Sequence, residues 1–209
     1  MKKKLVPDLS RLDMDAGFLR FSIHWQPNPE APDPDKPGQR LSRLDYVSLE
    51  PDKDCLCGSG KIYSDCCQPK RYWHPICLSP DMENYKLLAP QIATLHSVDG
   101  KTLRDRLMKD PRLYCTDDRM ENSAWVFWGD PAWEDEFGTL CFGGIEIREN
   151  QVIIITAMSD PQMQMLLKVL NELLDRPPGA PKIEYDQVEV IDKWAYRTDP
   201  PDKKTKIRF

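Results

Sequence analysis

Four of the seven cysteines in this chain lie within thirteen positions, and they are the side chains best suited to chemistry. Cys55 and Cys57 form a C-x-C pair, and the adjacent Cys66 and Cys67 follow after a Gly-Ser-Gly sequence at residues 58–60. Thiolates are soft ligands, and four of them close together match a closed, tetrahedral structural zinc site. The cluster therefore predicts one Zn²⁺ held by these four side chains, with no open position for a catalytic water.

The spacing indicates how both ends of the loop reach one ion. Side chains at i and i+2 of an extended chain point the same way, so both sulfurs of the first pair can face the metal. The glycines permit a tight turn, and residues 61–65 can begin a helical turn toward the second pair. Neighbouring side chains on a helix point about 100° apart, so Cys66 and Cys67 both bind only if that turn is distorted or ends there. One of the two is the least secure ligand, and His74 and Cys77 are nearby substitutes.

A known motif shares the following residues of this loop: Cys55, Cys57, Gly58, Ser59, Gly60, Lys61, Tyr63, Cys66 and Cys67. The stretch resembles the SEC-C motif, which is named for the C-terminal tail of the SecA preprotein translocase ATPase and also occurs in stand-alone bacterial modules. The resemblance implies zinc bound by the four cysteines and a role in binding a partner. Leu56 stands where the motif often has proline. Ser64 and Asp65 stand where it often has lysine, which weakens the basic face that the translocase tail uses toward its partners.

The composition limits the classes of partner. A net charge of −5 disfavours nucleic acid, and the only dense basic runs are residues 2–4 and 203–208, so nucleic acid or a ribosome is a possible but disfavoured partner. No apolar run approaches the roughly 20 residues that span a bilayer, and proline and aspartate follow the N-terminal lysines at once. We therefore expect a cytoplasmic protein without a membrane partner, where clustered cysteines hold metal more often than they form disulfides.

The chain divides by composition into three consecutive segments. Residues 1–39 are an N-terminal arm and a proline-rich linker, with five prolines in residues 27–38. Residues 40–77 form the SEC-C-like zinc module, and residues 78–209 form a small α+β domain with a polar C-terminal tail. We expect an α+β fold: a small treble-Cys zinc module plus a mostly antiparallel sheet packed by one long helix.

The long helix is predicted over residues 160–175. Ser159 and Gln162 have the spacing of a capping box, and an apolar stripe with helical spacing follows. A shorter helix is expected over residues 99–109, with Asp99 as its N-cap. Residues 80–96 have mixed helical features. Strands are expected over residues 18–25, 44–49, 123–128, 139–148, 152–156 and 183–191.

The remaining chemistry-bearing residues favour structural interpretations. Cys115 and Cys141 lie among apolar or strand-like residues, as buried structural cysteines do, and His24 and His96 are isolated. The common catalytic and nucleotide-binding motifs are absent from the sequence, so we assign no catalytic or cofactor-binding residue. The sequence predicts a zinc-binding accessory or adaptor protein that acts through protein–protein interaction. The alternative is an enzyme whose site lies in the C-terminal α+β domain, with the zinc only bracing the fold.

Overall fold

A computed structural model describes most of the central part of the chain. The described residues are 13–26, 39–96, 99–119, 121–128, 134–135, 137–174, 179–186, 188 and 190–194. The basic runs at residues 2–4 and 203–208, the proline-rich segment 27–38 and the polar tail from residue 198 lie outside them.

The chain forms two compact units, and neither is a continuous piece of sequence. Unit 1 comprises residues 1–22, 42–88 and 187–209, and unit 2 comprises residues 23–41 and 89–186. The cysteine loop therefore belongs to a unit that also takes in segments from both ends of the chain. It stays a prediction that the three consecutive segments expected from the composition fold independently as domains.

Strand β1 (Phe18–Gln26) is the central strand of one sheet. Residues 18–20, in unit 1, pair in parallel with β3 (Tyr72–Leu78), and residues 23–25, in unit 2, pair antiparallel with β9 (Gly138–Cys141). The sheet has the order β13-β3-β1-β9-β8, with β2 on β1 and β4 on β3. Its other strands are β2 (Gln39–Tyr46), β4 (Tyr85–Leu87), β8 (Glu134–Asp135) and β13 (Ile191–Asp192).

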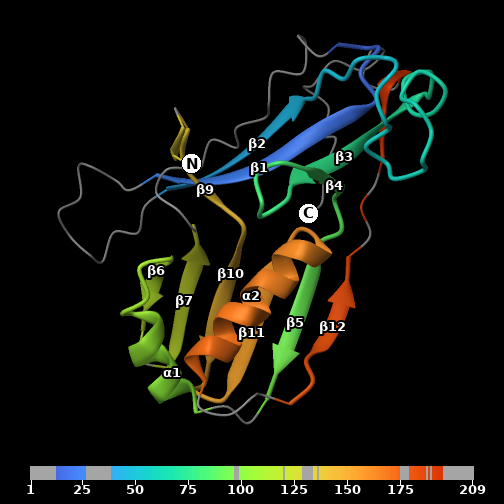
Figure 1. The fold of residues 1–209 in the computed structure, drawn as a ribbon. Helices are drawn as coiled ribbons and strands as arrows, with labels where there is room; N and C mark the ends of the chain where they lie inside the picture. The colour runs from blue at the N-terminus through green and yellow to red at the C-terminus, as the bar shows by residue number, and fades with distance from the viewer. Residues whose placement is uncertain are drawn as a thin grey trace. The chain divides into compact units, whose positions relative to one another are not determined.

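Unit 2 contains a second sheet of six strands, all of which pair antiparallel (Figure 1). Helix α2 (Asp160–Leu173) lies across it and contacts its two central strands, and α1 (Gly100–Leu107) packs on α2 and β10. In spatial order the strands are β12 (Lys182–Tyr185), β5 (Gln91–Leu95), β11 (Val152–Ala157), β10 (Gly143–Arg148), β7 (Asn122–Phe127) and β6 (Leu113–Asp118).

The core of unit 2 follows from alternating burial along four neighbouring strands, β5, β11, β10 and β7. A row of opposed residues crosses four neighbouring strands, and all of its side chains are buried: Ala93, Ile155, Ile145 and Trp125. The apolar stripe of α2 is buried as well, at Met163, Leu166, Val169 and Leu170. Strand side chains alternate between the two faces of the sheet, and helical side chains recur on one face every three to four residues. The buried face of the sheet and the buried face of α2 therefore pack together in one core.

The described residues form mostly antiparallel sheets with two helices, which is consistent with the expected α+β class but not with a single long helix. The helical interpretation of residues 80–96 is wrong, since this segment holds β4 and β5. The single strand expected over residues 139–148 is two strands, β9 and β10, which are separated at Phe142. Residues 183–191 likewise contribute to β12 and β13, which lie in different sheets. No helix in the described part of the chain is long and apolar enough to cross a membrane.

Candidate metal centre

The first two cysteines lie on a short hairpin that leads into the glycine turn. Asp54 and Ile62 form an isolated antiparallel bridge, and the backbone N–H of Cys55 donates to the carbonyl of Lys61 at 2.8 Å. Gly58 and Gly60 have φ angles of 74° and 71°, which non-glycine residues rarely adopt. The glycines of the motif are therefore required by the backbone conformation that reverses the chain between the two cysteine pairs.

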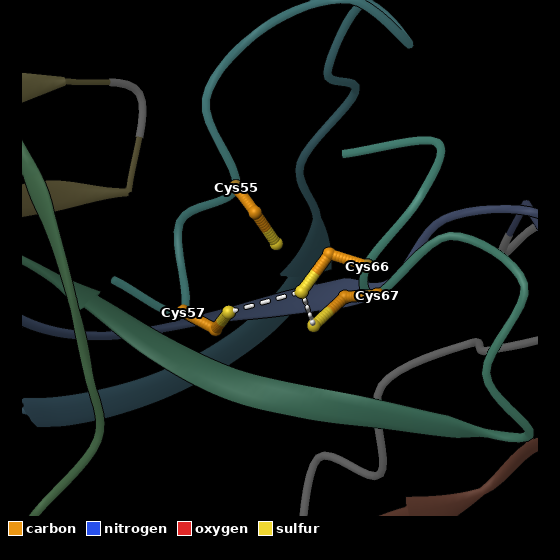
Figure 2. A group of neighbouring side chains, drawn as sticks. All are labelled: Cys55, Cys57, Cys66 and Cys67. Atoms are coloured by element: carbon orange, nitrogen blue, oxygen red, sulfur yellow. Dashed lines mark hydrogen bonds between the residues drawn. The ribbon is translucent and has the colours of Figure 1, made fainter. Parts of the chain in front are cut away.

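The second pair lies on irregular turns instead of a helix. The carbonyl of Tyr63 accepts hydrogen bonds from the N–H groups of both Cys66 and Gln68, at 3.1 and 3.2 Å. Residues 64–69 are turns, so the 100° separation of helical neighbours does not apply. Figure 2 shows that the side chains of Cys66 and Cys67 both point toward those of Cys55 and Cys57.

The four sulfur atoms lie close enough together to hold one metal ion. All of them lie within 4.8 Å of one another. The Sγ atoms of Cys57 and Cys66 are 3.4 Å apart, and those of Cys66 and Cys67 are 3.8 Å apart. Tetrahedral zinc with bonds of about 2.3 Å sets sulfur–sulfur distances of about 3.8 Å. The donor set therefore fits such an ion, and these thiols are free cysteines, not disulfides.

The other sequence candidates lie apart from this group. Among the described residues, Cys55, Cys57, Cys66 and Cys67 are the one set of three or more ligand-type side chains gathered closely enough for a metal. The nearby substitutes His74 and Cys77 both lie on β3 and are not members. Cys115 and Cys141 lie on β6 and β9, and His24 and His96 are likewise outside the group.

The loop packs on a small apolar cluster contributed by β1 and β3. Phe18 and Ile76 are fully buried against the cysteines and Tyr63. The Tyr63 hydroxyl accepts a hydrogen bond from the Gly17 N–H at 2.5 Å and donates one to the Asp15 carbonyl at 3.1 Å. Sequence reasoning included Tyr63 in the motif but gave it no role. Through these two hydrogen bonds, Tyr63 connects the metal loop (residues 55–67) to the residues that precede β1.

Hydrogen bonding and burial act differently on the individual thiols. Burial raises the pKa of Cys57, but hydrogen bonds from the side chain and backbone of Ser59, together with those from Cys55 and Cys66, outweigh it and lower that pKa to about 6. Burial, reinforced by hydrogen bonds with the neighbouring cysteines, raises the pKa of Cys67. The Ser59 hydroxyl also lies 3.1 Å from the Cys66 sulfur. Since a bound divalent ion deprotonates its thiol ligands outright, metal binding at this site releases protons.

Comparison of the chain with protein-family models, with curated proteins and with solved structures finds no match in any of the three. The four-cysteine cluster fits a zinc module. The resemblance to the SEC-C motif therefore rests on residues 55–67 alone.

Proposed function

We propose that this chain is a cytoplasmic zinc-binding accessory protein that acts by binding another protein, and that its zinc is structural. The observation that carries the proposal is the convergence of four cysteine sulfurs within 4.8 Å. Cys55, Cys57, Cys66 and Cys67 are the proposed ligands, and Zn²⁺ is the proposed ion because tetrahedral thiolate sites select it. The local match to the SEC-C motif supports the same assignment.

A structural role follows from the number of protein ligands. Four sulfurs complete a tetrahedral shell and leave no position for a reacting water, whereas catalytic zinc sites keep one open. The cysteines are also part of the apolar cluster around Phe18 and Ile76. A metal held there links the hairpin, the turns and two strands of unit 1, and its binding free energy contributes to folding.

Exposed aromatic side chains near the metal loop support a protein partner. Tyr72 is 38% exposed and Trp194 is 54% exposed. Tyr72 pairs with Asp192 on β13, and Trp194 follows that residue by two positions, so both belong to adjacent segments of unit 1. Tyrosine and tryptophan are enriched at protein interfaces, and the two side chains lie on paired segments of the unit that contains the cysteine cluster.

Metal content of three purified chains tests the zinc assignment. We expect one zinc per chain in the parent protein and in Cys115→Ser, which alters a cysteine outside the cluster, and no zinc in Cys57→Ser. Elemental analysis after gel filtration under reducing conditions measures this. No zinc in the parent, or equal zinc in all three chains, would refute the site.

Affinity capture with matched variants tests the proposed mode of action. The proposal expects a protein that is retained by the zinc-loaded parent and by Tyr185→Ala, which alters an aromatic residue of unit 2 that is 64% exposed. The same protein should be lost with Trp194→Ala and after chelation. A partner that binds equally under all four conditions contradicts the role of the metal unit.

A further inference from the structure

The segment at residues 191–194 is far from the cysteines in sequence but lies beside the chain that follows them. Ile191 pairs with Trp73, and Asp192 pairs with Tyr72. The pairing continues as a hydrogen bond of 3.0 Å from the Lys193 N–H to the carbonyl of Arg71. This docked segment brings the Lys193 side chain toward the metal loop.

Lys193 is a buried cation close to the turn that carries Cys67. Its relative exposure is 5%. Its ammonium lies 5.9 Å from the centre of the Trp73 ring and 3.5 Å from the carbonyl oxygen of Gln68, the residue after Cys67. Burial lowers its pKa, and negative charge on Asp15, Asp13 and Cys67 opposes this. Burying a cation is costly unless negative charge is nearby, and the negative groups that act on this ammonium are Asp15, Asp13 and Cys67.

A second lysine lies on the same side of the cysteine cluster. The Lys70 ammonium is 3.5 Å from the Cys67 sulfur. Lys70 contacts Cys67 and Lys193 contacts the carbonyl of the next residue, Gln68, so both ammonium groups lie beside the same turn of unit 1. Burial, together with positive charge on both lysines, lowers the pKa of His74. Negative charge on Cys67, the most deeply buried thiol of the cluster, acts on both lysines.

The charge of an occupied site matches these two cations. Four thiolates around a divalent ion carry a net charge of −2, and each lysine supplies +1. Such a charge is stabilised by N–H groups and ammonium ions that surround the ligands. The thiolates near a lysine also offset part of the penalty for burying it.

We propose that Lys70 and Lys193 neutralise the metal-bound thiolates, so that metal binding and docking of residues 191–194 reinforce each other. This inference rests on the proposed zinc site. Because such coupling is reciprocal, the docked segment raises metal affinity, and the metal holds the segment on β3. The position of residues 191–194 is thereby made responsive to metal occupancy.

Zinc affinity of matched lysine variants tests the coupling. We expect Lys193→Met to bind zinc about tenfold more weakly than the parent, the effect of losing one close charge interaction of about 1.4 kcal/mol. Lys193→Arg should retain most of the affinity. Lys53→Met is the control, because Lys53 is 59% exposed, belongs to the same unit and pairs with Glu50. Competition with a chromophoric chelator gives the dissociation constants.

Amide hydrogen exchange of the unaltered chain provides a second measurement that does not depend on how a variant folds. Exchange at the Lys193 amide should be slower in the zinc-loaded protein than after chelation. Equal affinities for Lys193→Met and the parent, or metal-independent exchange at residues 191–194, would overturn the coupling while leaving the zinc site intact. A parent chain without zinc would overturn both proposals.

Discussion

Replacing Gly17 with alanine tests whether the entry to β1 positions the metal loop. A Cβ atom at residue 17 would lie 2.8 Å from the carbonyl oxygen of Cys67 and 3.0 Å from the Tyr63 ring. Ordinary van der Waals contact begins near 3.4 Å, so the Cys67 backbone would have to move by about 0.6 Å. Metal–ligand distances tolerate only about 0.2 Å, and overpacking of this kind costs roughly 1–3 kcal/mol.

Residue 17 cannot move away easily, because hydrogen bonds hold it on both sides. Its N–H bonds to the Tyr63 hydroxyl, and its carbonyl accepts the N–H of His74 at 2.9 Å. The strain should therefore displace the Cys67 backbone and lower both the stability of the zinc-loaded protein and its affinity for zinc. We expect the zinc-loaded protein to lose about 2 kcal/mol in its free energy of unfolding, and zinc affinity to fall by about tenfold.

Urea unfolding of the zinc-loaded protein and chelator competition measure these two quantities. Gly179→Ala is the matched control, because a Cβ at that exposed position meets no atom within 4 Å, and it should change stability by less than about 0.5 kcal/mol. If Gly17→Ala leaves stability and affinity at the values of the control, the close packing of β1 against the metal loop has no energetic importance and the reasoning fails.

Two further substitutions test separate features. Gly58→Ala should cost about 1 kcal/mol, because the φ of 74° strains a residue with a Cβ; Gly58→Asn, which tolerates this region better, should recover part of the loss in urea unfolding, and equal losses for both would argue against strain. In unit 2, hydrogen bonds from Arg112, 2.7 Å away at its closest nitrogen, lower the pKa of Asp110. A lowered folded pKa stabilises the protein above the unfolded value of about 3.9 and loses this effect as the pH falls through the folded pKa. Asp110→Asn should therefore destabilise by about 1 kcal/mol at pH 7 and progressively less as the pH falls below about 3.9, and a deficit that does not change with pH would contradict the ion pair.

The sequence predicted the two helices, because the signals for their ends lie within a few neighbouring residues. Asp99 caps α1 as expected, accepting a hydrogen bond from the Thr102 N–H at 3.1 Å. The capping box of α2 is only partly formed, since Ser159 makes no side-chain capping bond and Gln162 accepts the N–H of Met158 instead. Helix ends are thus set by competing hydrogen bonds that differ little in free energy.

Where the sequence failed, contacts distant in the chain decide the structure. Residues 91–95 alternate between buried and exposed positions and pair with both β11 and β12, which overrides their mixed local preference. The division of residues 139–148 has a similar cause. Gly143 has a φ of 150° and approaches the carbonyl of Thr156 on the neighbouring strand closely.

At the candidate site too, the sequence predicted what depends on neighbouring residues and missed what depends on distant ones. Its spacing and glycines predicted that the four sulfurs would meet, because those features act over thirteen residues. The contributions of Gly17 and Lys193 could not be predicted in this way, since they depend on pairing of β1, β3 and β13 across the chain.

The discontinuous composition of unit 1 has a consequence for biosynthesis. Arg71 and its ion-pair partner Asp192 are 121 residues apart, and at about 5–20 residues per second a ribosome needs roughly 6–24 s to synthesise the chain between them. During that interval the four thiols have been translated but the last strand that supports them has not. With zinc at the proposed site, we expect the yield of correctly folded protein to depend on delivery of the ion to the nascent chain during this interval.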